Sequence, residues 1–488
     1  MAAALLDLGV VPGDRVALLM GNCPEWVSIY YACSRVGAVV VPMNPKLAPP
    51  EVFYILHHCR PKILWLDRSW METLAPDSDS LRQTVERVIV CSPGTISGSC
   101  DGFLVHDEIL PEEPDLDELD RISREIDLED DHSICYTAGT TGHPKGAVLT
   151  HCNILMSQFY LLSLEYQLSR DDVFLISTPF CHRTGWGRVI LSIGLGAKLV
   201  VMEKFDPVGM LEEIARHRVS VIGIVPTVLK RLLNLPDFEQ YDRSSVRVLL
   251  LTGEACRPSD LQELRRGFPN ALVHGFLSST EAGTISNLKP EDQASKPESV
   301  GRPIPGVQVR IVDDQGQDLP IGGVGEIWVH SGRRGTYTMM AGYFNNPQAN
   351  EENFSGNWFH TGDMGYIDPE GFLHITDRKK DMIISGGINI YSKEVELAVS
   401  SHEAVSEVAV IGVPDPVWGE SVKAYVVLKP NASATAEELI EHCRQRIASY
   451  KKPRSVDFVD ELPKNAAGKV LKQVLRQHAR SLQQKQTG

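Results

Sequence analysis

The stretch Thr137-Ala138-Gly139-Thr140-Thr141-Gly142-His143-Pro144-Lys145-Gly146 carries the strongest structural signal in this sequence. Its glycines let the backbone approach an anion closely, and its threonine hydroxyls and lysine ammonium supply hydrogen-bond donors. The residues before it, 133–136, are typical of the end of a strand, and an apolar run resumes at 147–151. The loop therefore predicts a binding site for nucleotide phosphates. It is not a Walker loop, because Gly146 follows Lys145 where a magnesium-binding serine or threonine would stand.

Outward from this loop, short apolar runs alternate with helical segments. Strand-like runs at 172–177, 198–202, 219–225 and 246–253 are interspersed with helix-like segments at 208–217 and 227–233. Continuous apolar strands joined by helices predict parallel sheets that are covered on both faces.

The pattern changes twice towards the C-terminus. Runs at 307–312 and 325–330 are separated by turn residues, as in antiparallel β structure. Beyond Arg378, strand-like runs at 408–413 and 423–428 precede a helix that we expect over 435–450, where Thr435 and Glu438 form a capping box. We therefore expect residues 379–488 to form a small, separate α+β domain.

Composition limits the classes of function. The chain has 488 residues, which favours more than one domain, and its 43% hydrophobic and 23% charged residues are ordinary for a soluble enzyme. The net charge of −15 is concentrated in residues 107–131, which hold thirteen acidic residues and two arginines and which we interpret as a solvated connection. The sequence has no basic stripe for nucleic acid.

Targeting and redox signals favour a reduced, cytoplasmic enzyme. No apolar run approaches the length of a membrane span, and the first residues lack the basic flank of a signal peptide. The ten cysteines are scattered without a C-x-x-C pair, which argues for free thiols used in packing and against a zinc site. The sequence leaves the choice between monomer and homodimer open.

Four further segments follow the phosphate loop in a fixed order. They are Ser279-Thr280-Glu281-Ala282-Gly283, Trp358 to Gly371, Asp377 to Gly387, and Leu462 to Lys469. Together, and over nearly the whole chain, the five segments resemble the adenylate-forming superfamily of acyl- and aryl-CoA synthetases, adenylation domains and firefly-type luciferases.

The resemblance implies a fold and a reaction. The fold is an α/β architecture with a large N-terminal domain, 1–378, built from two doubly wound α/β subdomains and a small β-barrel-like subdomain. A small mobile α+β domain, 379–488, follows, with a hinge near Lys380. The reaction activates a fatty or aryl carboxylic acid with ATP and Mg²⁺, releases pyrophosphate, and then transfers the acyl group from AMP to the thiol of CoA.

The family's nucleotide residues carry over to matching positions here. The resemblance assigns the β- and γ-phosphates to the loop, Mg²⁺ to the hard oxygen ligand Glu281, and the ribose to Asp363 with Arg378 beside it. Taken alone, a Thr-Glu pair is more often a surface turn or a helix cap, and Thr361-Gly362-Asp363 could equally be a turn. The phosphate residues are Thr137, Gly139, Thr140, Thr141, Gly142, Lys145 and Thr280.

The same resemblance assigns the catalytic and acyl-site residues. Lys469 would bridge the carboxylate and the α-phosphate during adenylation, although an isolated Gly-Lys pair is usually a solvated loop. His182 would lie near the carboxylate that is activated, whereas a lone histidine is more often packing or surface. Gly253, Glu254 and Phe276 would line the adenine and acyl sites, and Phe276 stands one residue before the position of the family's usual aromatic.

The CoA site and the alternatives complete the expectation. Gly386 and Gly387 would approach the pantetheine tunnel, and Tyr450, Lys452 and Trp418 would contact the CoA nucleotide, with ordinary surface packing as the alternative for each of these three. Residues 3–10 match a helix that relatives reach later, so we expect the family's first segment to be missing. The alternative functions are an enzyme that loads a carrier protein and a catalytically impaired nucleotide-binding homologue.

Overall fold

The computed structural model describes residues 1–74, 78–91, 103–137, 144–251, 258–386, 388–464 and 470–486. The chain divides into two compact units: unit 1 is Met1–Val309 with Val329–Phe359, and unit 2 is Arg310–Trp328 with His360–Gly488. The sequence suggests a domain boundary at 378, which does not coincide with the division into these two units. That boundary stays a prediction.

The first sheet of unit 1 has eight strands in the order β17-β7-β6-β2-β1-β3-β4-β5. From β6 to β5 the strands run parallel, whereas β7 is antiparallel to β6 and β17 is antiparallel to β7. The strands are β1 (Arg15–Leu19), β2 (Val39–Pro42), β3 (Ile63–Asp67), β4 (Arg87–Cys91), β5 (Leu104–Val105), β6 (Asp131–Thr137), β7 (Lys145–Thr150) and β17 (Gly342–Tyr343). The helices between them are α1 (Ala2–Asp7), α2 (Pro24–Val36), α3 (Pro49–Cys59), α4 (Arg68–Leu74), α5 (Ser78–Thr84) and α6 (Leu116–Glu125).

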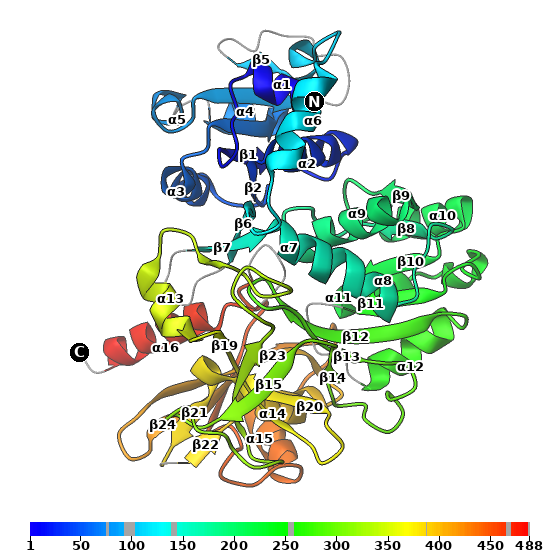
Figure 1. Ribbon diagram of the computed structural model, residues 1–488. Helices are drawn as coiled ribbons and strands as arrows, with labels where there is room; N and C mark the ends of the chain where they lie inside the picture. The colour runs from blue at the N-terminus through cyan, green and yellow to red at the C-terminus, as the bar shows by residue number, and fades with distance from the viewer. Residues whose placement is uncertain are drawn as a thin grey trace. The chain divides into compact units, whose positions relative to one another are not determined.

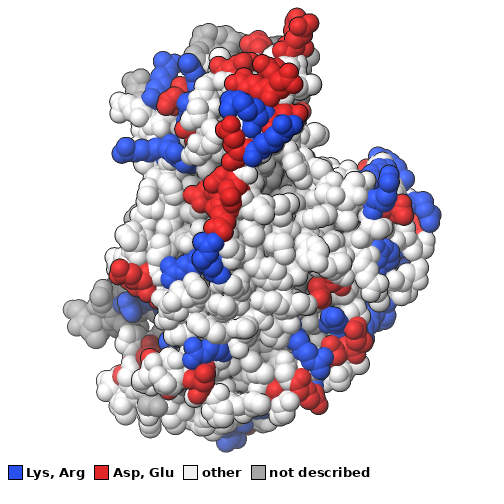
Figure 2. Space-filling view, viewed as in Figure 1, with Lys and Arg blue, Asp and Glu red and all other residues white. Residues whose placement is uncertain are grey.

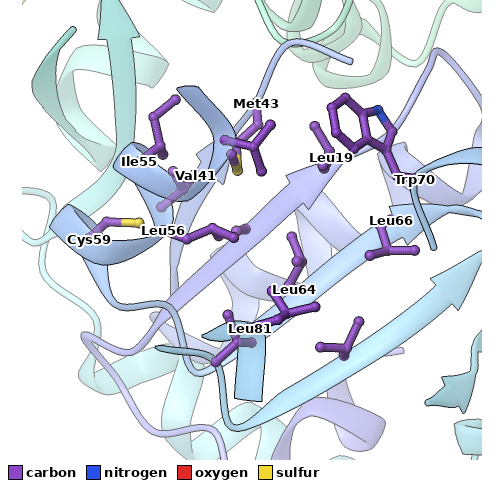
Figure 3. Close-up of a cluster of buried hydrophobic side chains, with 14 of the residues drawn as sticks. Leu19, Val41, Met43, Ile55, Leu56, Cys59, Leu64, Leu66, Trp70 and Leu81 are labelled. Atoms are coloured by element: carbon purple, nitrogen blue, oxygen red, sulfur yellow. The ribbon is translucent and has the colours of Figure 1, made fainter. Parts of the chain in front are cut away.

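One face of this sheet forms a hydrophobic core with α3, α4 and α5 (Figure 3). Leu19 and Leu64 project from the strands, Leu56 and Cys59 from α3, and Trp70 from α4. Each large apolar side chain buried in this way contributes on the order of 2 kcal/mol. The core holds in place the strands from which the site loops depart.

The second sheet of unit 1 has seven strands in the order β14-β13-β12-β11-β10-β8-β9. From β9 to β12 they run parallel, and β13 and β14 are antiparallel additions. The strands are β8 (Val173–Ile176), β9 (Lys198–Val201), β10 (Val221–Ile224), β11 (Val248–Leu251), β12 (Leu272–Ser279), β13 (Gly283–Leu288) and β14 (Arg302–Pro303). These strands confirm the predicted parallel sheet.

Helices cover both faces of the second sheet (Figure 1). One face packs on α10 (Pro207–His217), α11 (Pro226–Leu233) and α12 (Pro258–Gly267). The other packs on α8 (Leu161–Glu165) and α9 (Arg183–Leu195); α8 continues from α7 (His151–Asn153) through a π-helical segment, Ile154–Tyr160. Residues alternate between the faces, so that Ile222 meets the first helix layer and Val221 the second.

The acidic segment is not merely a solvated connection, and that interpretation was wrong in part. It contains α6, whose first turn is capped by Asp115 accepting a hydrogen bond from the backbone N–H of Glu118 at 2.9 Å. Leu119 and Ile122 are buried and hold the helix against the rest of unit 1, while its carboxylates face solvent (Figure 2). The three-residue spacing of these two apolar side chains was hidden among the charges.

A third sheet has the order β15-β16-β19-β18, with β20 paired to β19. Its strands are β15 (Gln308–Val312), β16 (Gly325–His330), β18 (Phe354–Ser355), β19 (Trp358–Ile367) and β20 (Leu373–Arg378), and α13 (Pro347–Asn353) precedes β18. The antiparallel pairing of β19 with β20 agrees with the predicted change of pattern in this part of the chain.

The C-terminal part of unit 2 is an α+β structure, as predicted. Its sheet has the order β22-β21-β24-β23, with β25 beside β24. Its elements are β21 (Ile383–Ser385), β22 (Ile388–Ile390), β23 (Val405–Asp415), β24 (Gly419–Leu428), β25 (Ser455–Phe458), α14 (Ser392–Ser400), α15 (Ala436–Arg444) and α16 (Lys472–Gln486). The capping box at Thr435 and Glu438 is confirmed, but α15 ends at Arg444 and not near Tyr450, because turns replace the helix from Gln445 onward.

Candidate active site

The predicted phosphate loop joins two antiparallel strands of unit 1. Thr137 ends β6 and Lys145 begins β7, and the two residues are register partners. The Thr137 hydroxyl also donates to the carbonyl oxygen of Lys145 at 3.5 Å. The structure thus holds both ends of the loop together. Gly139, Thr140, Thr141 and Gly142 lie outside the described residues.

Glu281 is the carboxylate to which this hairpin is tied. The Thr137 hydroxyl donates to Glu281 Oε1 at 3.2 Å, and the Tyr343 hydroxyl donates to the same oxygen at 3.2 Å. Burial, and then the Glu281 charge, raise the pKa of Tyr343, so its phenol stays a protonated donor. The Lys145 ammonium lies 5.2 Å from the centroid of the Tyr343 ring. The residues predicted to bind phosphate and metal therefore meet at one place, around Tyr343.

The Glu281 carboxylate suits a magnesium ion. Among the described residues, both hydrogen bonds to it end on Oε1, which leaves Oε2 for a cation. No group of three or more His, Cys, Asp or Glu side chains that could hold a metal occurs in the part of the chain that is described. One protein carboxylate nevertheless fits Mg²⁺, which keeps several waters and takes further oxygens from phosphates.

Arg183 fixes the turn that carries Thr280 and Glu281. Its guanidinium donates to the carbonyl oxygens of Ser279, at 3.4 Å, and of Thr280. It also reaches the Ser157 hydroxyl at 3.3 Å. Burial lowers its pKa to about 10, which leaves it charged at neutral pH. The sequence shows Arg183 next to His182, but it does not reveal that the Arg183 side chain points towards this turn.

His182 lies at the N-cap of α9, at the end of a loop that Asn22 holds. The Asn22 amide donates to the carbonyl of Thr178 at 3.0 Å and accepts from the backbone N–H of Phe180 at 2.8 Å. Burial, and then the neighbouring Lys46, lower the pKa of His182, so its imidazole is neutral at pH 7. The predicted role of His182 stays a prediction, and Asn22 is a positioning residue that the sequence did not reveal.

Phe276 lies in β12 and packs beside the aromatic pair Tyr166 and His274. Its ring centroid is 6.2 Å from that of Tyr166, which is 4.7 Å from that of His274. Whether Phe276 contacts adenine stays a prediction. Gly253 and Glu254 lie outside the described residues.

Unit 2 brings together the two residues expected at the ribose. Asp363 in β19 and Arg378 in β20 are register partners. Arg378 Nε lies 2.7 Å from Asp363 Oδ1, and a second guanidinium nitrogen donates to the carbonyl of Thr361 at 3.4 Å. Asp363 is buried and Arg378 is half-exposed, so the pair presents its guanidinium side to solvent.

The predicted hinge residue Lys380 follows this pair in a short 3-10 turn, Lys379–Asp381. Lys380 is exposed, as the sequence suggested, and the partial desolvation of its ammonium lowers its pKa. Arg476 donates to the carbonyl of Lys380 at 3.3 Å and pairs with Asp381 at 2.8 Å. Asp377 accepts hydrogen bonds from Ser392 at 3.1 Å and from the backbone N–H of Arg378 at 2.7 Å, linking β20 to α14.

The residues expected at CoA fall into two groups in unit 2. Gly386 has φ of +60° and donates to the carbonyl of Trp418 at 2.7 Å, and the Arg454 guanidinium lies 5.0 Å from the Trp418 ring. Tyr450 is 52% exposed, and Lys452 donates to the carbonyl of Ser449 at 3.2 Å. Gly387 and Lys469 lie outside the described residues. Their roles, and those of Trp418 and Tyr450, stay predictions.

Comparison with known proteins places this geometry in a family. The family described as AMP-binding enzyme matches residues 1–344, and the AMP-binding enzyme C-terminal domain matches residues 394–469. The chain is 35% identical over 479 residues to the long-chain-fatty-acid–CoA ligase FadD13 of Mycobacterium tuberculosis, covering 98% of this chain and 90% of that protein. It is 36% identical over 479 residues to a feruloyl-CoA synthase of Amycolatopsis, covering 98% and 91%.

A solved structure agrees over the same length. The o-succinylbenzoate CoA synthetase MenE of Bacillus subtilis, in complex with an acyl-adenylate, matches with a TM-score of 0.82 and 32% identity, covering 97% of this chain and 90% of that one. The same enzyme in complex with ATP and magnesium ion matches with a TM-score of 0.81 and 31% identity, covering 98% and 92%. The fold therefore matches that of MenE over nearly the whole length of both chains.

Proposed function

The chain belongs to the AMP-binding enzyme family and is an ATP-dependent acid:CoA ligase, and we propose that the site around Glu281 is where its acid becomes an acyl-adenylate. The observation that carries this assignment is the meeting of Thr137, Lys145 and Tyr343 at Glu281. These residues come from three separate segments of unit 1, and a surface turn would not need them together.

Adenylation brings an anionic carboxylate to a polyanionic triphosphate, so positive charge dominates its chemistry. Lys145 and the Thr137 and Thr280 hydroxyls bind the β- and γ-phosphates, together with Gly139, Thr140, Thr141 and Gly142 of the loop. Glu281 would hold the magnesium ion, which would supply positive charge against the phosphates. Arg183 keeps the turn with Thr280 and Glu281 in place through hydrogen bonds to the carbonyl oxygens of Ser279 and Thr280.

The other residues bind the remaining parts of the substrates. His182, neutral at pH 7, orients the carboxylate, and Phe276 with Gly253 and Glu254 lines the adenine and acyl sites. Asp363 accepts hydrogen bonds from the ribose hydroxyls, and Arg378 supports it. Lys469 bridges the carboxylate and the α-phosphate.

The thioester step is assigned to unit 2. Gly386 and Gly387 leave room for the pantetheine thiol, and Trp418, Tyr450 and Lys452 contact the CoA nucleotide. Lys380 is the hinge about which the C-terminal domain rotates between the adenylation step and the thioester step. The product side of the reaction is therefore CoA thioester and AMP. The acid is a fatty or aryl carboxylic acid.

Two properties of the setting follow from the same reasoning. The eight cysteines within the described residues are free thiols, which suits a reducing compartment, and we place the enzyme in the cytoplasm. No helix in the described part of the chain combines the length and apolar character of a membrane span.

The test is a panel of carboxylic acids with ATP, Mg²⁺ and CoA, with AMP and the CoA thioester as readouts. At least one acid should give both products in equal amounts. Glu281→Gln should remove AMP formation, because a neutral amide binds Mg²⁺ poorly. Acid-dependent AMP formation with transfer only to a phosphopantetheinyl carrier would overturn the assignment of CoA, and no AMP with any acid would overturn the ligase.

A half-reaction experiment separates the roles of the two units. Lys469→Ala should abolish adenylation yet leave thioester formation from a supplied acyl-adenylate within about twofold, because the proposed bridge is made only in the first step. Equal loss of both half-reactions would count against the role of Lys469.

A further inference from the structure

Helix α9 buries a second arginine, Arg188, which the reaction as described does not use. Its side chain is 4% exposed, and one guanidinium nitrogen donates to the Thr178 hydroxyl at 2.9 Å. Its Nη2 has no hydrogen-bond partner among the described residues, and no carboxylate among them forms an ion pair with it. Burial lowers its pKa to about 10, so it remains charged at neutral pH. A buried charge without an anionic partner is costly.

The sheet beneath Arg188 is shaped to receive it. A Cβ built on Gly223 of β10 would lie 1.7 Å from the Arg188 guanidinium carbon and 2.1 Å from Nε. The guanidinium therefore lies directly on the backbone of a central strand, in the space that any other residue would fill. Glycine inside a strand weakens it, and such a position usually marks a close approach of another group. The close approach here is that of the charge.

The neighbouring side chains on this face add further unpaired polar atoms. Gly223, Leu250 and His274 are register partners across β10, β11 and β12, so they form one row on one face of the sheet. The Tyr166 ring meets the His274 ring edge to face, with 4.7 Å between the ring centroids. Burial raises the pKa of Tyr166, and the nearby Arg188 charge opposes that shift. Tyr166 OH and His274 Nδ1 are buried and have no hydrogen-bond partner within the described ranges. Burial lowers the pKa of His274 to about 4, so it is neutral and adds no charge.

Arg188 lies on the helix that begins at the proposed carboxylate site. Arg188 follows His182 by six residues, which is about 9 Å along an α-helix. Its hydrogen-bond partner Thr178 belongs to the loop that ends at His182. A ligand held at His182 and extended along α9 would reach the guanidinium.

We propose that Arg188, with Tyr166 and His274, binds a second anionic group of the acid, so that the preferred substrate is a dicarboxylic acid. This inference rests on the proposed ligase function. It identifies the substrate class by the buried charge of Arg188, for which the described residues provide no anionic partner. Arginine suits this task because its planar fork binds a carboxylate through two parallel hydrogen bonds.

The experiment compares acids in matched pairs: the α,ω-dicarboxylic acids from adipate to azelate against the n-alkanoates of equal chain length, and 4-carboxyphenylacetate against 4-methylphenylacetate. We expect kcat/KM for AMP formation to favour the diacid by about 100-fold or more, because a site built for a polar group rejects the analogue that lacks it. In Arg188→Met, the diacid should lose about 100-fold, mainly through KM, while the matched monoacid is unchanged or improves.

Thr178→Val is the matched control. It removes the one described hydrogen bond to Arg188 but keeps the charge, so the preference for diacids should survive. If Arg188→Met does not fold, Arg188→Lys takes its place. This variant keeps a cation and should retain a diacid preference of at least about tenfold. The proposal would be overturned if the wild-type enzyme had the same kcat/KM for monoacids as for the matched diacids. It would also be overturned if Arg188→Met lowered kcat/KM equally for both kinds of acid. No AMP with any acid would refute the ligase function itself, which is a separate outcome.

Discussion

Tyr343→Phe is the most direct test of the site around Glu281, because it removes one hydroxyl and leaves the aromatic ring. The hydroxyl donates to Glu281 Oε1 at 3.2 Å, as does Thr137. The ring, which lies 5.2 Å from the Lys145 ammonium, remains in place. The change therefore weakens the support of the metal-binding carboxylate without altering charge or packing.

The size of the effect follows from the geometry. A hydrogen bond to a charged group contributes about 1.5–3 kcal/mol. At 3.2 Å this one is longer than the 2.5–2.7 Å typical of a hydroxyl on a carboxylate, so the lower end applies. About 1.5 kcal/mol corresponds to slightly more than tenfold. We expect kcat/KM for ATP to fall about tenfold, with partial recovery at high Mg²⁺ concentration. Because the raised pKa of Tyr343 keeps the phenol protonated, the loss should not vary with pH across the neutral range.

The assay is the initial rate of AMP formation with ATP varied at several fixed Mg²⁺ concentrations. Tyr30→Phe is the control, since Tyr30 is also buried and its hydroxyl has no hydrogen-bond partner in the described part of the chain. In a Glu281→Gln background, Tyr343→Phe should cost much less, because the two groups act as one unit. An unchanged ATP dependence, or an equal loss in Tyr30→Phe, would refute the reasoning.

Asp363→Asn removes the carboxylate paired with Arg378 at 2.7 Å, and the KM for ATP should rise at least about tenfold while that for CoA is unchanged; a change in the KM for CoA alone would contradict the ribose role. Gly386→Ala places a methyl 2.7 Å from the Trp418 ring at a φ of +60°, which should cost about 1–2 kcal/mol and slow thioester formation more than adenylation in half-reaction assays. Equal slowing of both would argue against a role specific to the second step. Burial lowers the pKa of His132 well below its ordinary value, so below about pH 6.5 the unfolded state binds more protons and the free energy of unfolding should fall by up to about 1.4 kcal/mol per pH unit. Urea unfolding from about pH 7.5 to 5.5 should show this slope, and His132→Asn should reduce it; identical slopes would show that other groups carry it.

The order of strands and helices could be predicted because it depends on local pattern. Runs such as 219–225 and 246–253 are apolar throughout, which is typical of strands buried on both faces, and they are β10 and β11. The capping box at Thr435 identified the start of α15 correctly. Its end was not predictable from the same signals, because turns stop α15 at Arg444 where the sequence has neither glycine nor proline.

The residues that complete the site could not be predicted, because they reach it through long-range packing. Tyr343 is 62 residues from Glu281 and belongs to a two-residue strand added at the edge of the first sheet. Asn22 is far in sequence from the loop that it holds, since 158 positions separate it from Phe180. Arg183 is likewise far in sequence from the turn that it holds. Such contacts follow from topology, and no periodicity in the sequence records them.

The two buried arginines of α9 show how differently the fold can use the same charge. Arg183 and Arg188 are 7% and 4% exposed, and burial lowers the pKa of each to about 10, so both carry a comparable desolvation cost. The charge of Arg183 is offset by the backbone carbonyls of Ser279 and Thr280. Among the described residues, Arg188 has one hydrogen bond, to the Thr178 hydroxyl, and its guanidinium packs on Gly223 of β10. Removing a charge from water without compensation costs several kcal/mol, and the described residues give Arg188 no anionic partner. An anionic substrate bound along α9 would supply that compensation during each turnover, and this is why the specificity of the enzyme should depend on Arg188 while its chemistry depends on the turn that Arg183 holds.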